Sequence, residues 1–188
     1  QQSQVVVASA ASVDAISFVA GYQMPVGQTL RLAGTLTSPL ISVFSDNSVG
    51  VGDDVSRAVG VGTIDGSLSL SGDNPASADG LVFQLNGDGS GDVLNVSGQI
   101  IKTGANPIRI TVIPDINARL QPSYDIITHN GGSLSGSDFE VVGAQAFPGS
   151  RISYSAEVAS PGVVRIVEQG SALSLTWTGA NGNFWDVA

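Results

Sequence analysis

Very few side chains in this 188-residue chain are of the types that perform acid–base or nucleophilic chemistry. Cysteine is absent and there is one histidine, His129, so a serine–histidine–aspartate triad would have to use it. A zinc site cannot be assembled from one histidine and no cysteine. His129 stands in the sequence His-Asn-Gly-Gly, which is typical of an exposed turn. We therefore expect a solvated loop histidine and a protein that is not an enzyme.

Aspartates are the next candidates. Two pairs could supply carboxylate ligands to calcium: Asp53 with Asp54, and Asp88 with Asp92 in the sequence Gly-Asp-Gly-Ser-Gly-Asp. The same residue types favour tight turns, and turn formation is the interpretation we prefer. Calcium is thus the one cofactor that the sequence leaves open.

The glutamates Glu140, Glu157 and Glu168 are the residues that a polysaccharide-cleaving enzyme would need, because glycoside hydrolysis uses paired carboxyl groups. Each lies in a stretch with alternating apolar residues, which predicts a strand with the glutamate facing solvent. A polysaccharide-degrading β-helix enzyme is therefore kept only as an alternative.

The composition predicts an all-β protein that does not bind nucleic acid. Valine, isoleucine, threonine and glycine are abundant, whereas lysine occurs once, so strand and turn formers dominate. The net charge of −9 argues against nucleic acid and against an anionic membrane surface as partners. No apolar run approaches the length of about 20 residues that spans a membrane. The absence of cysteine and scarcity of lysine favour a secreted bacterial surface protein.

A short phrase, Leu-x-(Leu/Val)-(Ala/Ser)-Gly, occurs at residues 30–34, 68–72 and 94–98. Each copy joins an alternating strand to a glycine turn, so we take it as the unit of the fold. The irregular spacing excludes a uniform solenoid but fits a right-handed parallel β-helix with loop insertions. A β-sandwich or jelly roll is the alternative, since it also has short strands between frequent turns.

Residues 1–188 are expected to form a single β-rich domain whose two ends differ in sequence pattern from the central part. Residues 1–20 are predicted to be an N-terminal cap or an arm. Residues 171–188 are predicted to be a C-terminal strand and tail, which either ends free or is the end of a fragment.

Three segments resemble autotransporter-associated β-strand repeat proteins, which are related to the passengers of bacterial autotransporters. Residues 175–186, LTWTGANGNFWD, resemble that family's tryptophan-glycine-asparagine-tryptophan-aspartate phrase. Residues 124–136 are similar to a phrase that closes a passenger, and residues 91–100 to one of its rungs. The resemblance implies a right-handed parallel β-helix displayed outside the cell, with structural or adhesive roles in a surface layer or biofilm matrix.

Both termini carry candidate interaction residues. The alternation of Leu173, Leu175 and Trp177 predicts a strand that adds to a neighbour's edge, and the Val5-Val6-Val7 run predicts a strand near the other end. The interaction candidates are Val5, Val6, Val7, Leu173, Leu175, Trp177, Phe184 and Trp185. We expect an extracellular structural protein that binds copies of itself in a fibre, filament or matrix. A carbohydrate-binding adhesin, with the aromatic residues stacking on surface glycans, is the alternative.

Overall fold

The computed structural model describes residues 4–8, 12–14, 21–52, 58–73, 80–114, 119–144, 152–160 and 162–170. Within them the chain is built from β-strands and one 3-10 turn, η1 (Gly136–Asp138). The calls on Asp53, Asp54 and the tail from residue 171 onward lie outside the described residues.

The first wall of the fold is a purely parallel sheet. Its strands, in spatial order, are β1 (Gln4–Val7), β4 (Thr29–Leu32), β6 (Ser48–Val51), β8 (Leu81–Leu85), β11 (Ile108–Pro114) and β13 (Phe139–Val142). Every neighbouring pair in this sheet runs parallel. Because spatial order follows chain order, each strand belongs to a later turn of the chain than the one before it.

The second sheet is bent and supplies two further walls. Its main path is β2 (Ser12–Asp14), β5 (Thr35–Val43), β7 (Val61–Ser71), β9 (Val93–Val96), β12 (Ser123–His129), β15 (Val163–Gln169) and β14 (Ser153–Ser160). The first halves of β5 and β7 pair with β2 and β9, and their second halves pair with β3 (Tyr22–Gln23) and β10 (Ile100–Thr103). The first halves therefore form a second wall and the second halves a third.

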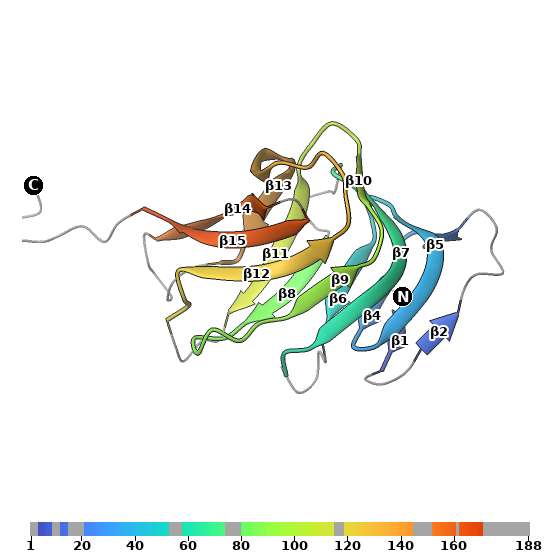
Figure 1. The fold of residues 1–188 in the computed structure, drawn as a ribbon, viewed down its shortest axis with the longest axis horizontal. Coiled ribbons are helices and arrows are strands. Elements are labelled where there is room, and N and C mark those ends of the chain that lie inside the picture. The colour runs from blue at the N-terminus through green and yellow to red at the C-terminus, as the bar shows by residue number, and fades with distance from the viewer. Residues whose placement is uncertain are drawn as a thin grey trace, which may run out of the picture.

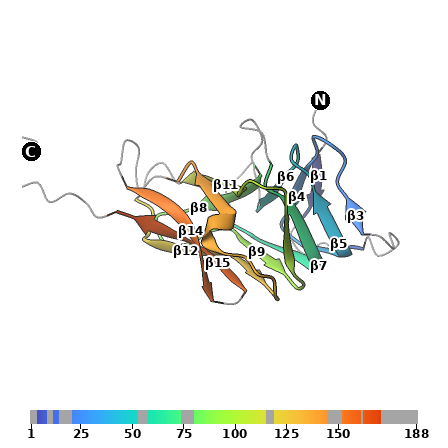
Figure 2. The same cartoon turned by 90° about the horizontal axis from the view of Figure 1, so that it is seen from above.

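The chain winds repeatedly through these walls as a β-solenoid of about four turns. Figure 1 shows the turns stacked along the long axis, and Figure 2 shows the same stack from above. This confirms the predicted parallel β-helix. It rules out the β-sandwich alternative, because a sandwich of hairpins would pair its strands antiparallel.

The core is a set of apolar columns that run along the solenoid axis. In the first wall, side chains on one face of each strand stack on those of the next turn. One such column consists of Val5, Leu30, Val49, Leu81, Ile110 and Val141. Its four central members are at most 1% exposed. Stacking of like side chains between turns is thus what holds the solenoid together.

The irregular spacing of the repeated phrase has two causes: loops at one corner differ in length, and the copies lie on different walls. The chain passes from β4 to β5 in residues 33–34, but from β8 to β9 in residues 86–92 and from β13 to β14 in residues 143–152. These are the loop insertions that the sequence predicts. The three copies of the phrase, however, lie on different walls: one in β4, one in the second half of β7 and one in β9. Each copy marks a strand followed by a corner, so the copies are not equivalent rungs.

Glycine at a corner allows two turns to approach closely. Gly66 has a φ of +146°, and a Cβ there would lie 1.7 Å from the carbonyl oxygen of Ser38 in the turn below. On the turn above, the Gly98 amide donates to the Gly66 carbonyl at 2.8 Å. A side chain at residue 66 would therefore separate the turns.

Candidate functional site

The N-terminal end of the solenoid presents strands with an unpaired edge. Among the described residues β1 pairs only with β4, while β2 and β3 both pair only with β5. Val7 of β1 points inward and is 1% exposed, whereas Val6 points outward and is 60% exposed. An apolar edge without a charged residue is a template for pairing with another strand.

Two more apolar side chains are exposed beside this end. Val26 is 77% exposed and Phe44 is 44% exposed, and both lie at the corner between the third and first walls. Asn47 binds the two turns of this corner together: its side-chain amide donates to the Met24 carbonyl at 3.2 Å, and its side-chain oxygen accepts from the Gln28 amide at 3.2 Å. The exposed apolar residues are therefore held on rigid backbone.

The C-terminal end is built differently. In the second sheet the strands beyond β12 stop running parallel, because β15 pairs antiparallel with β12 on one side and with β14 on the other. Figure 1 shows this hairpin, in orange and red, across the end of the stack. The hairpin supplies apolar residues to the core, since Val164 and Ile166 are both 0% exposed. We call β14 and β15 the cap.

Two tyrosine hydroxyls bond to backbone groups at this end of the solenoid, one from β12 and one from the cap. The Tyr124 hydroxyl donates to the Asn86 carbonyl at 2.6 Å and accepts from the Gln121 amide at 2.7 Å. The Tyr154 hydroxyl donates to the Gln121 carbonyl at 3.1 Å. Burial of these rings raises the pKa of both phenols, so both remain neutral donors at physiological pH.

The segment around η1 closes the third side of the same end. A Cβ on Gly136 would lie 2.5 Å from the Ala156 carbonyl oxygen of β14, so this segment packs directly on the cap. Lys102 of β10 forms an ion pair with Asp138 at 3.0 Å. Hydrogen bonds from Ser135, followed by the Lys102 interaction, lower the pKa of the Asp138 carboxyl.

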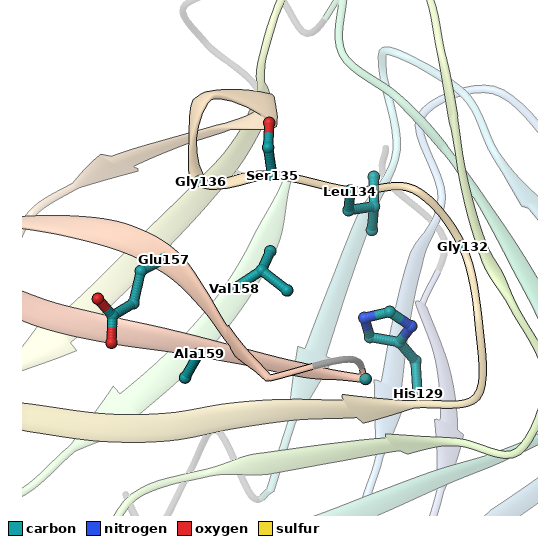
Figure 3. A pocket seen from close by; sticks show the side chains of 9 residues that line it. His129, Gly132, Leu134, Ser135, Gly136, Glu157, Val158 and Ala159 are labelled. Atoms are coloured by element: carbon teal, nitrogen blue, oxygen red, sulfur yellow. The ribbon is translucent and has the colours of Figure 1, made fainter.

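A pocket of about 720 Å³ lies between this segment and the cap, where the third wall has no strand after β10. Figure 3 shows His129 pointing into it, with Leu134 and Val158 on the other sides. His129 is the last residue of β12 and is only 9% exposed. The expected solvated loop histidine is thus wrong: the turn begins one residue later, and the strand turns the imidazole inward.

Two of the predicted calcium ligands, Asp88 and Asp92, are described, and their carboxylates accept hydrogen bonds from backbone amides. Asp92 is 2% exposed, and its carboxylate accepts from the Gly60 amide at 2.8 Å and the Gln84 amide at 2.7 Å. Burial raises the pKa of Asp92 to about 6, although both hydrogen bonds oppose the shift. The exposed Asp88 accepts from the Ser90 amide and hydroxyl. Among the described residues no cluster of three or more metal-binding side chains occurs. Calcium binding stays a prediction.

The glutamates do not converge on one another. Glu140 pairs with Arg109 at 3.5 Å, and Glu157 lies 3.8 Å from Arg165. Glu168 pairs with Arg119 at 3.1 Å, and its side chain is only 15% exposed, so the expectation that it faces solvent is wrong. Each carboxylate has its own arginine, which is the arrangement of structural ion pairs.

The structure brings part of the predicted interaction set to one place. Val5, Val6 and Val7 form β1 at the N-terminal edge. The other members, Leu173, Leu175, Trp177, Phe184 and Trp185, lie outside the described residues. The described part of residues 1–20 is the first turn of the solenoid itself, paired with β4 and β5. The exposed corner at Val26 and Phe44 had no signal in the sequence, since neither residue belongs to a periodic stretch.

A comparison with models of known protein families and a comparison with curated proteins find no match for this chain. The described residues contain no helix long and apolar enough to cross a membrane.

Proposed function

We propose that this chain is a non-enzymatic, extracellular structural protein of a bacterial surface, which joins copies of itself through exposed strand edges into a fibre, filament or matrix. The observation that carries this proposal is the inequality of the two ends. One end finishes in an antiparallel hairpin that folds across it, with β14 against β13 and the η1 segment, while the other leaves the edges of β1, β2 and β3 without a described partner.

The unpaired end has the chemistry of an acceptor for a strand. The backbone groups along the free edge of β1 can bond to an added strand, and Val6 offers an apolar contact on the outer face. Val26 and Phe44 extend the apolar surface at the same end of the solenoid. Natural sheet edges that avoid pairing carry lysine, proline or a bulge, and β1 has none of these.

The strand that fills this edge is supplied, in this proposal, by the C-terminal tail of another copy. Leu173, Leu175 and Trp177 alternate with polar residues, as a strand with one buried face does. The tail follows β15, at the capped end of the molecule. A tail from the capped end of one copy that pairs with the open end of the next generates a head-to-tail, non-closing assembly, which is a filament.

Placement outside the cell rests on composition and on the resemblance to autotransporter-related surface proteins. A fold that depends on stacked apolar columns and backbone pairing needs no disulfide, and cysteine is absent. The −9 net charge keeps individual copies soluble before they assemble.

Electron microscopy and sedimentation velocity of the purified chain test the proposal. The full chain is expected to form elongated assemblies as its concentration rises, and the chain ending at Gly170 is expected to remain monomeric. The matched control is Trp177→Ser combined with Leu175→Ser, which keeps the tail's length but removes its apolar face. Full-length protein that stays monomeric at every concentration, with and without calcium, would contradict the proposal.

A further inference from the structure

The pocket beside His129 results from the way the solenoid ends. In the preceding turns the third wall is closed by β3, β5, β7 and β10. After His129 the chain passes through Gly131 and Gly132, which have φ values of +95° and +112°, and forms no strand before η1. No wall strand covers the space between this segment and the end of β14, and this space is the pocket.

One ring nitrogen of His129 has its partner and the other does not. Nδ1 lies 2.7 Å from the Gly131 carbonyl oxygen, which can only accept, so Nδ1 carries the proton. In the neutral ring Nε2 is therefore an acceptor. Nε2 is buried and has no hydrogen-bond partner among the residues that the structure describes. A buried polar atom without a partner costs about 1–3 kcal/mol, so a donor placed beside it would be favoured.

The rest of the lining is mainly apolar and carries no charge toward the pocket centre. Leu134, Val158 and Ala159 face the space together with glycine backbone. Figure 3 shows the Glu157 carboxylate turned away from the pocket, and it lies 3.8 Å from Arg165. Ser135 is also engaged elsewhere, because its hydroxyl donates to Asp138 at 2.9 Å. His129 Nε2 is thus the polar group available to orient a ligand.

We infer that this pocket binds a small, uncharged and mostly apolar molecule that donates one O–H or N–H hydrogen bond to His129 Nε2. An anion finds no cation facing the pocket among the lining residues, and a metal ion finds no second ligand there. Because Nε2 is buried, the donor reaches it as the atoms that cover it move aside. The inference is independent of the self-association proposed above.

The single histidine makes a direct test possible. A long-range proton–nitrogen NMR spectrum of the full chain contains one imidazole, so Nε2 is observed without overlap. The probes are cyclohexanol, which has one donor, and methoxycyclohexane, which has the same ring and no donor. Cyclohexanol is expected to shift the Nε2 resonance saturably and to bind about fivefold to tenfold more tightly than the ether, which is the effect of one hydrogen bond.

Two variants keep the result falsifiable. His129→Phe retains a ring but removes the acceptor, and should abolish the preference for the alcohol. Val158→Phe fills the pocket without altering the imidazole, and should abolish the cyclohexanol shift while the Nδ1–H tautomer is retained. Val61→Phe, at a site that is 52% exposed on β7, is the matched control and should bind as the wild type does. The inference would be overturned if neither probe moved the Nε2 resonance, or if both moved it equally. It would also be overturned if the only donor to Nε2 were an ordered water molecule.

Discussion

The two ends of this solenoid differ in how the backbone groups of the outermost turn are covered. Each turn of a parallel coil needs a turn on both sides, so the first and last turns are left with unpaired backbone groups. At the C-terminal end the chain reverses direction, and β15 and β14 form an antiparallel hairpin across the stack, with β14 against β13 and the η1 segment. At the N-terminal end the described strands all run parallel to their neighbours, and β1, β2 and β3 are each paired on one side only.

The difference between the two ends shows that covering the end of a solenoid depends on more than the pairing of strands. The cap combines reversed strands with fully buried apolar residues and with a hydrogen bond from the Tyr154 hydroxyl to the Gln121 carbonyl. Beside it, the Tyr124 hydroxyl of β12 donates to the Asn86 carbonyl. The open end has inward-facing valines but exposes Val6, Val26 and Phe44. An end that buries its inner face and leaves its edge open fits the proposed role of acceptor for a further strand.

Glycine substitutions should separate the two ends most strongly. Gly162, in the turn of the cap, has a φ of +93° and a Cβ there would lie 2.2 Å from the His129 carbonyl oxygen. Gly162→Ala is expected to lower the free energy of unfolding by about 4 kcal/mol, through backbone strain and overpacking. Gly27 has a φ of +72° with no atom near a Cβ, so Gly27→Ala should cost only about 1–2 kcal/mol. Equal losses in denaturant titrations would contradict this account of the ends.

A change of pH should act on the body between the ends. Asp92 joins the third and fourth turns, and burial raises its pKa to about 6. Between pH 4 and 6 the unfolded chain releases this proton while the folded chain keeps it, so the free energy of unfolding falls by about 3 kcal/mol as pH rises through that window.

Urea titrations across pH 4–7 would measure the effect. Asp92→Asn should flatten the profile between pH 4 and 6, whereas Asp88→Asn, at an exposed carboxylate of the same loop, should leave it intact. A profile that rises over this window in the wild type would be inconsistent with a raised pKa at Asp92.

Matched valines test the packing of each end. Val164 in β15 is 0% exposed and Val7 in β1 is 1% exposed, so they are equally buried. Val164→Ala should lower the free energy of unfolding by about 2 kcal/mol, because β15 is paired on both sides and the cavity cannot collapse. Val7→Ala should cost less in the unassembled chain, because an edge strand frays before the rest unfolds. Hydrogen exchange should correspondingly be faster in β1 than in β15.

The smallest effect is expected at η1, beside the cap. Hydrogen bonds from Ser135, and then Lys102, lower the pKa of Asp138, so its contribution is present at neutral pH and is lost as pH falls through the lowered value. This sign is opposite to that of Asp92. The contribution of the Asp138 contacts can be measured by hydrogen exchange of residues 132–138 in the wild type and in Asp138→Asn, at neutral pH and in acid. Identical protection in both proteins at neutral pH would show that the contacts contribute nothing.

The body of the fold was predictable from the sequence because its signal is local. Alternation in residues 30–36 and 108–113 places apolar side chains on one face, and glycine after a strand marks a corner. The positions of the three repeated phrases within a turn were not predictable, because the phrase encodes only a strand and a corner.

The cap and the pocket depend on contacts that are distant in sequence. Nothing in the alternation of residues 153–158 indicates that β14 pairs antiparallel with β15 while earlier strands pair parallel. His129 resembled a turn residue because Asn130, Gly131 and Gly132 follow it, yet the Gly162 carbonyl accepts its amide at 2.7 Å and holds it in β12. A residue more than thirty positions away thus determines its burial.

The most direct test of the central claim is sedimentation velocity on Val6→Lys beside Val61→Lys. Both valines are more than half exposed, at 60% and 52%, but Val6 lies on the edge strand β1 and Val61 on the internal strand β7. A lysine on the edge should abolish the concentration-dependent assembly of the full chain, and a lysine on the internal strand should leave it unchanged. Assembly that survives Val6→Lys, or that both variants weaken equally, would contradict the claim that copies join through the open end.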